Sequence, residues 1–194
     1  MKIFTFLPIN YFLVLFKGCE EMNIDDIVEE FRVANYTHFD QFYNETKKNV
    51  FFTIIAIIKD RSVVDDLMQD TYIKFLENIS KYQNTSINAY LSTMARNIAI
   101  NYYNKEKRVV HDDEIIDYQQ AEDNNKKDYQ YVEVMEMLKT LDDTSREIVI
   151  MHTINDLKFK EIAKIIGKPL GTILWIYNKA IKELQRKVGA NDEK

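Results

Sequence analysis

The side chains that most often carry out catalysis are few in this sequence, and they are scattered. Its three histidines, His38, His111 and His152, do not have the spacing of metal ligands. The run Asp112-Asp113-Glu114 has the ligand type for a cation, but a solvated acidic segment is the better explanation. We find no glycine-rich phosphate loop and no nucleophile elbow. We therefore expect no enzyme, no cofactor and no metal site, and we look for a binding function.

Charge is divided unevenly along the chain, whose formal net charge is −5. Residues 109–137 carry nine acidic residues against two lysines, whereas residues 157–188 carry eight basic residues against two acidic ones. An acidic middle and a basic C-terminal end favour different surfaces for different partners. The single cysteine, Cys19, excludes an intrachain disulfide framework and favours a reducing compartment, so we expect a cytoplasmic protein.

Apolar residues at spacings of three and four predict helices through most of the chain. The strongest segments of the first part are 39–60, 62–82 and 87–108. Long helices with short connections are typical of a small bundle. Residues 109–130 lose this periodicity and are predicted to be a flexible acidic linker, with one weak helical turn at Ile115–Tyr118. Helical pattern returns at 131–187, so we expect an all-α fold of two small helical domains.

Residues 1–21 form an apolar N-terminal extension that stands apart from this pattern. The fourteen residues from Ile3 to Phe16 are uncharged, and Pro8 interrupts them. The run is short for a membrane span. We favour a translation start at Met22, and a membrane-contacting tail or a signal peptide are the alternatives.

The stretch 159–184 has the apolar spacing of one long helix, but Gly167, Pro169 and Gly171 interrupt it. Such an interruption predicts two helices joined by a tight turn, which is the helix-turn-helix layout. The first helix is expected at Phe159–Ile166. Gly167 can take the positive φ of a helix C-terminus, and Pro169 prevents the helix from continuing beyond it.

The second helix is predicted to begin near Gly171, with Thr172 as its cap. Its inward side is a stripe of apolar residues, namely Ile173, Ile176, Tyr177, Ala180 and Leu184. Such a helix would lie in the major groove of DNA, with Lys179 and Lys182 near phosphates. An αα-hairpin in an ordinary helical domain is the alternative interpretation.

These residues resemble region 4 of the sigma-70 family, extracytoplasmic-function (ECF) subgroup. The matching residues are Leu141, Arg146-Glu147, Glu161-Ile162-Ala163, Gly167, Pro169, Gly171-Thr172 and Ala180. The first part of the chain resembles region 2 of the same family. Its matching residues are Asp66, Leu67, Gln69, Asp70, Tyr72, Leu76, Leu91, Met94, Ala95, Arg96 and Asn97. The resemblance covers about residues 25–188, and two motifs in the family's order make it specific.

The resemblance implies an initiation subunit of bacterial RNA polymerase, which catalyses nothing and gives the polymerase its promoter specificity. It divides the chain into the extension (1–21), region 2 (22–108), the linker (109–130), region 4 (131–188) and a tail (189–194). It also implies that Asp66, Gln69 and Asp70 bind the helical clamp of the largest polymerase subunit. Asp66 and Asp70 are one turn apart and would share a helix face. Without the resemblance, a solvated acidic face would be the better explanation.

Region 2 would hold the upstream promoter element while the strands separate, which requires aromatic surfaces for unstacked bases and positive charge for phosphates. The candidate residues are Tyr90, Arg96, Asn97, Tyr102, Tyr103, Lys105, Lys107 and Arg108. We expect one of Tyr102 and Tyr103 to be packed rather than both to be exposed. The family usually has Trp at the position of Tyr90, and Tyr keeps a stacking face.

Region 4 would bind the distal promoter element. The candidate residues are Lys160, Lys168, Thr172, Leu174, Trp175, Asn178, Lys179 and Lys182. The sequence departs from the family pattern where Lys, Ser and Arg are usual, because it has Leu174, Trp175 and Ile176 there. We therefore expect phosphate contacts and DNA shape to dominate, with Leu174 or Trp175 touching thymine methyls or sugars. Packing of Trp175 on the first helix or the linker is the alternative. Asp142 stands where Pro is usual and is expected to cap the next helix.

Core RNA polymerase and promoter DNA are the partners that the resemblance implies, with no small-molecule substrate. Many relatives are silenced by an anti-sigma partner, and such a partner is a hypothesis for this chain. The main rival function is a helix-turn-helix regulator that acts without forming a holoenzyme. Such a regulator would have no use for a face built from Asp66, Gln69 and Asp70.

Overall fold

The computed structural model describes residues 22–58, 60–83, 86–109 and 137–191, and within these ranges it forms helices and turns without a strand. The N-terminal half (residues 22–109) contains α2 (Ile24–Arg32), α3 (Phe39–Ile55), α4 (Val64–Glu77) and α5 (Ile87–Val109), with the short 3-10 turns η1 (Arg61–Val63) and η2 (Ile79–Lys81). The C-terminal half (residues 137–191) contains α7 (Asp143–Thr153), α8 (Phe159–Ile166) and α9 (Leu170–Asn191). The predicted all-α fold is confirmed.

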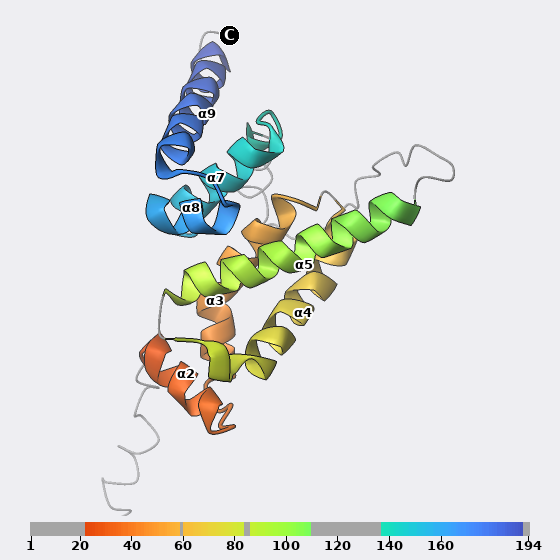
Figure 1. Ribbon diagram of the computed structural model, residues 1–194, viewed down its shortest axis with the longest axis vertical. Helices are drawn as coiled ribbons and strands as arrows, with labels where there is room; N and C mark the ends of the chain where they lie inside the picture. The colour runs from red at the N-terminus through yellow and green to blue at the C-terminus, as the bar shows by residue number, and fades with distance from the viewer. Residues whose placement is uncertain (1–21, 59, 84–85, 110–136, 192–194) are drawn as a thin grey trace, which may run out of the picture.

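Helix α5 lies at the centre of the arrangement. It packs on α3 and α4 on one side, and α8 contacts it on another side, while α7 contacts α3 (Figure 1). Helix α9 packs on α7 and α8 and extends away from the N-terminal half (Figure 1). No described helix combines the length and the hydropathy that crossing a membrane requires.

Aromatic side chains fill the core of the N-terminal half. Phe42 of α3 and Phe75 of α4 stack with ring centroids 5.1 Å apart, and Phe31 of α2 meets Phe42 edge-on at 5.2 Å. The hydroxyl of Tyr72 lies 2.9 Å from the hydroxyl of Thr46, and burial raises the pKa of this phenol well above its usual range. Each buried ring contributes about 1.5–3 kcal/mol relative to an exposed one. These contacts therefore hold α2, α3 and α4 together.

The two halves also share a core of their own. Phe52 of α3 and Ala56, directly after this helix, are buried together with Val149 and Ile150 of α7 and Ala180 of α9. We call this group the shared core. Because its members come from both halves, the halves are packed against one another.

The structure adjusts several predicted helix boundaries in the N-terminal half. The helix predicted at 39–60 ends at Ile55, because the Asp60 carboxylate accepts the Ser62 N–H at 2.9 Å and starts η1 instead. The segment 62–82 divides into η1, α4 and η2, whereas the segment 87–108 is one helix, as predicted. Three predicted features lie outside the described residues, namely the extension 1–21, positions 110–130 of the linker and the turn at Ile115–Tyr118.

Candidate polymerase and nucleic-acid interfaces

The outward face of α4 carries the residues predicted to bind polymerase. The helix buries Val64, Leu67, Met68, Thr71, Tyr72 and Phe75. This leaves Asp66, Gln69 and Asp70 exposed on one side. Asp66 lies in the first turn, where a carboxylate is favoured by the helix dipole.

The sequence analysis missed one member of this face. Ile73 follows at the next helical position and is 54% exposed. The signal in the sequence was its position, seven residues after Asp66 and three after Asp70.

The candidate DNA residues of α5 do not share one environment. Tyr90 is partly buried and meets Phe75 and Tyr82 edge-on, with ring centroids 6.1 and 5.1 Å apart. Tyr102 packs on the core of the N-terminal half, whereas Tyr103 is exposed, so the expectation that only one of this pair is free is confirmed.

The remaining candidates on α5 are mostly solvent-facing. Asn97, Lys105 and Lys107 are exposed, and the ammonium group of Lys107 lies 4.6 Å from the centroid of the Tyr103 ring. The Lys107 ammonium group donates a hydrogen bond to the Tyr103 oxygen, which raises the pKa of Lys107, and the charge of Tyr103 and, more weakly, that of Asp143 of α7 act in the same direction. The side chain of Arg108 lies outside the described residues. The C-terminal end of α5 therefore presents aromatic and cationic groups together.

Arg96 differs from these residues because it is already paired. Its Nε donates to the Glu147 carboxylate of α7 at 2.6 Å. The two side chains are only 19% and 11% exposed, so water screens the pair weakly.

The turn between α8 and α9 has the predicted construction. Gly167 has φ 74°, its N–H donates to the Ala163 carbonyl at 3.0 Å, and the Lys168 N–H donates to the same carbonyl at 3.1 Å. The first helix, Phe159–Ile166, is confirmed to the residue. The left-handed conformation at Gly167 is what a glycine at this position allows.

The prediction that Thr172 caps the second helix is wrong. Helix α9 begins at Leu170, two residues earlier, and the Pro169 carbonyl accepts the N–H groups of Thr172 and Ile173 at 2.9 and 3.1 Å. Thr172 therefore lies within the first turn and is exposed. The reason is that proline cannot continue α8 but its own carbonyl can accept the first bonds of the next helix.

The predicted inward stripe of α9 is confirmed. Ile173 and Ala180 are buried, and Ile176, Tyr177 and Leu184 are partly buried against the neighbouring helices.

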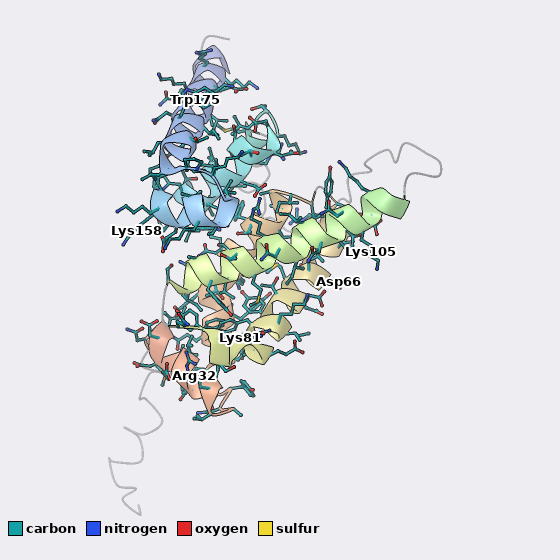
Figure 2. All side chains as sticks on the ribbon, in the orientation of Figure 1. Arg32, Asp66, Lys81, Lys105, Lys158 and Trp175 are labelled. Atoms are coloured by element: carbon teal, nitrogen blue, oxygen red, sulfur yellow. The ribbon has the colours of Figure 1, made fainter. Side chains whose placement is uncertain are left out.

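The opposite side of α9 faces solvent. Trp175 is 64% exposed and Leu174 is 36% exposed, so Trp175 does not pack on the first helix (Figure 2). The ammonium group of Lys179 lies 5.4 Å from the centroid of the Trp175 ring, which is a cation–π distance. The other candidates of this half are also exposed, namely Lys160, Lys168, Thr172, Asn178 and Lys182.

Asp142 caps α7 as predicted. Its carboxylate accepts the Ser145 N–H at 2.9 Å and the Ser145 hydroxyl at 2.6 Å. These bonds, and more weakly the charge of Lys179, lower the pKa of Asp142 from its usual value of 3.8. In the described part of the chain, no three histidine, cysteine or acidic side chains come together as a metal site would require.

Comparison with known proteins shows which family has this sequence pattern. The family model for Sigma-70 region 2 matches residues 42–109, and the model for Sigma-70, region 4 matches residues 131–173. The ECF RNA polymerase sigma factor SigM of Bacillus subtilis is 26% identical over 161 residues, which cover 79% of this chain and 98% of that protein. The chain belongs to the sigma-70 family, ECF subgroup. SigK of Mycobacterium tuberculosis, an ECF sigma factor, is 25% identical over 171 residues and covers 79% of this chain and 88% of its own length.

Solved structures agree with the fold of this sigma factor. The sigma factor RpoE of Bartonella quintana, solved with the anti-sigma factor NepR, has a TM-score of 0.61 at 22% identity over 78% of this chain and 96% of its own. CnrH, solved with the cytosolic domain of CnrY, has a TM-score of 0.63 at 18% identity over 87% of this chain and 99% of its own. At these identities the likeness concerns the fold alone.

The match to region 4 ends at residue 173, immediately before the positions where this sigma factor departs from the family pattern. Leu174, Trp175 and Ile176 therefore lie just beyond the matched residues. Two of these three side chains are the exposed apolar groups described above.

The sequence analysis gave no role in the fold to residues that join the two halves of this sigma factor. Arg146, Glu147 and Asn155 are all buried, and each bonds to the N-terminal half. One signal was available in the sequence: Ile148–Met151 is a continuous apolar run, which covers all sides of one turn of α7. A helix that is apolar all round is normally covered on all sides.

Proposed function

We propose that this ECF sigma factor binds core RNA polymerase through α4 and positions promoter DNA through α5 and α9. The observation that supports this most directly is the exposed face of Asp66, Gln69 and Asp70 on a helix inside the region 2 match. A regulator that acts without polymerase would not need this face. Region 2 is taken as residues 22–108, the linker as 109–130 and region 4 as 131–188, and the protein acts in the cytoplasm, where polymerase and promoter meet.

The proposed polymerase contact is mainly electrostatic and includes one apolar side chain. Two carboxylates one turn apart can accept arginine side chains from a partner helix, and the Gln69 amide can donate or accept beside them. Ile73 extends the same face with an exposed side chain. Such a contact combines charge for orientation with a small area of apolar burial.

Region 2 binds the separated promoter strand along α5. Asn97 offers an amide that can both donate to and accept from a base edge. Tyr103 offers an exposed ring on which a base can stack, and Lys105, Lys107 and Arg108 supply charge for phosphates. Tyr90 and Tyr102 act mainly through packing, because both rings lie against the core of the N-terminal half.

Region 4 reads duplex DNA by contact with apolar groups rather than by hydrogen bonds. Leu174 and Trp175 lie near the start of α9, which is the part of a recognition helix that reaches base edges. In the major groove, an apolar side chain distinguishes thymine by its methyl group. Lys179 lies beside Trp175, and the exposed Lys160, Lys168 and Lys182 add charge for phosphates.

An anti-sigma partner is a further part of the proposal. Two proteins that share this fold were solved with such partners, NepR and CnrY. A partner of this kind would act by covering the α4 face or the DNA faces of α5 and α9.

The test is run-off transcription with the full chain, core polymerase and DNA of the host genome, with the start sites mapped. The wild type should give specific starts. Asp66→Arg combined with Asp70→Arg should reduce them by about 100-fold or more, because reversing the charges at a charge-paired contact costs several kcal/mol.

The matched control is Asp40→Arg combined with Asn44→Arg, which places two arginines one turn apart at the start of α3, on exposed positions. This control should keep its specific starts. DNA binding without polymerase and no starts with it would contradict the proposal and favour a holoenzyme-independent regulator.

A further inference from the structure

The first turns of α9 concentrate apolar side chains at the surface. Among the described residues of the C-terminal half, the large apolar side chains that are exposed are Met137, Leu170, Leu174 and Trp175. Three of these four lie between positions 170 and 175, at the start of one helix. Scattered exposed apolar residues need no explanation, but a group of them marks a candidate binding surface.

Gly171 lies in the middle of this group and leaves a space there. Apart from the adjoining residues and the backbone of its own helix, no atom lies within 4 Å of the place that a Cβ atom of residue 171 would occupy. Helical spacing puts Leu170 and Leu174 on one side of this space and Trp175 on the other. We call the space and these three flanking side chains the Gly171 site. It has room for a group of the size of a methyl group, with apolar neighbours on both sides.

Polar and positively charged residues border the Gly171 site. Gly171, Trp175, Asn178 and Lys182 follow one another at helical intervals, so they share the outward face of α9. The ammonium group of Lys179 lies 5.4 Å from the centroid of the Trp175 ring. Positive charge around an apolar space favours a ligand that is anionic and also presents a small apolar group. Duplex DNA is such a ligand, because it carries phosphates and the C5-methyl groups of thymine.

We propose that the Gly171 site receives the C5-methyl group of a pyrimidine in the distal promoter element, and that it accepts 5-methylcytosine as readily as thymine. Methylation of a cytosine at this position of the DNA then strengthens promoter binding. This inference rests on the proposed function, since it takes the start of α9 to contact base edges.

The polar residues beside the site explain why both bases are accepted. Thymine and 5-methylcytosine share the C5-methyl group and differ at C4, where thymine has an oxygen that accepts and 5-methylcytosine has an amino group that donates. The exposed side chains nearest in sequence that could contact this position are the Thr172 hydroxyl and the Asn178 amide. Each of these groups can both donate and accept a hydrogen bond, so neither selects one base over the other.

The test measures binding of the holoenzyme, assembled from the full chain and core polymerase, to promoter duplexes altered at one pyrimidine of the distal element at a time. Thymine and uracil differ only in the methyl group, and so do 5-methylcytosine and cytosine. At one and the same position, the methylated member of each pair should bind about fourfold more tightly, as burial of one methyl group predicts.

Gly171→Ala is the decisive variant, because it puts a methyl group of the protein where the methyl group of the base would lie. Residue 171 does not have a positive φ, and alanine favours a helix more than glycine does. The variant should therefore melt at a temperature no lower than the wild type, while both binding ratios fall to about one. The matched control is Gln185→Ala, an exposed position near the other end of α9, which should keep both fourfold ratios.

Two results would overturn the proposal. One is a Gly171→Ala variant that still distinguishes methylated from unmethylated bases. The other is a wild type that distinguishes thymine from uracil but not 5-methylcytosine from cytosine, which would restrict the site to thymine. Run-off transcription by the wild type is independent of these ratios. Specific starts together with ratios of one at every position would therefore reject this inference and leave the proposed function standing.

Discussion

Helices α5 and α9 carry the two sets of proposed DNA contacts, and they present them in opposite ways. On α5, Tyr90 packs on the core and Arg96 is paired with Glu147. On α9, Trp175 is mostly exposed and Leu174 partly so, and Lys179 lies beside the Trp175 ring. The comparison teaches that two region 2 candidates, Tyr90 and Arg96, also stabilise the fold, whereas the exposed side chains of α9 are available for recognition alone.

The largest difference in stability between the two helices should appear when one aromatic ring is removed from each. Tyr90→Ala should lower the free energy of unfolding by about 2–4 kcal/mol, because the ring meets both Phe75 and Tyr82. Trp175→Ala should change it by no more than about 0.5 kcal/mol, because the ring is mostly exposed. Urea denaturation followed by circular dichroism measures both, and equal losses would break the comparison.

The next largest effect on stability concerns the first residues of the helices α7 and α9. Asp142→Ala should destabilise the protein by about 1 kcal/mol, because it removes the cap of α7. Thr172→Ala, in the first turn of α9, should change stability by less than about 0.5 kcal/mol, since this side chain caps nothing.

The pH dependence of the Asp142 effect has a definite sign. Its pKa is lowered in the folded protein, so its contribution is present above the usual carboxyl pKa of 3.8 and is lost as the pH falls through the lower folded value. The unfolding free energies of wild type and Asp142→Ala should therefore converge in acid. A constant difference down to the acid limit would show that the cap does not act through its charge.

The smallest effect is expected from a change in the DNA and concerns promoter binding. Replacing a thymine of the distal element by uracil removes one methyl group, and loss of its burial against Leu174 or Trp175 should cost about 0.8 kcal/mol, or about fourfold in promoter binding by the holoenzyme. The same exchange should have no effect on a Leu174→Ala and Trp175→Ala double variant. Equal sensitivity in the wild type and the double variant would place the thymine contact elsewhere.

The sequence predicted the elements of both halves because local rules decide them. Apolar spacing located α5, and a glycine followed by a proline located the end of α8 at Ile166. The start of α9 was misplaced because two residues compete for it: Thr172 has a capping side chain, but the Pro169 carbonyl comes first along the chain.

Such local rules could not predict the contacts between the halves. Glu147 was recognised as part of a family motif, but nothing local indicates that its partner is Arg96, 51 positions away. In the same way, Asn155 lies in a segment that has the composition of a surface turn, although it is fully buried. Pairing between distant residues depends on how finished helices pack, which periodicity alone does not specify.

The contact between Arg96 and Glu147 forms within one molecule. This determines how the contact responds to a change in protein concentration. Its formation does not depend on protein concentration, so dilution leaves the fraction of paired molecules unchanged. Making more sigma factor therefore raises the paired and unpaired populations in the same proportion.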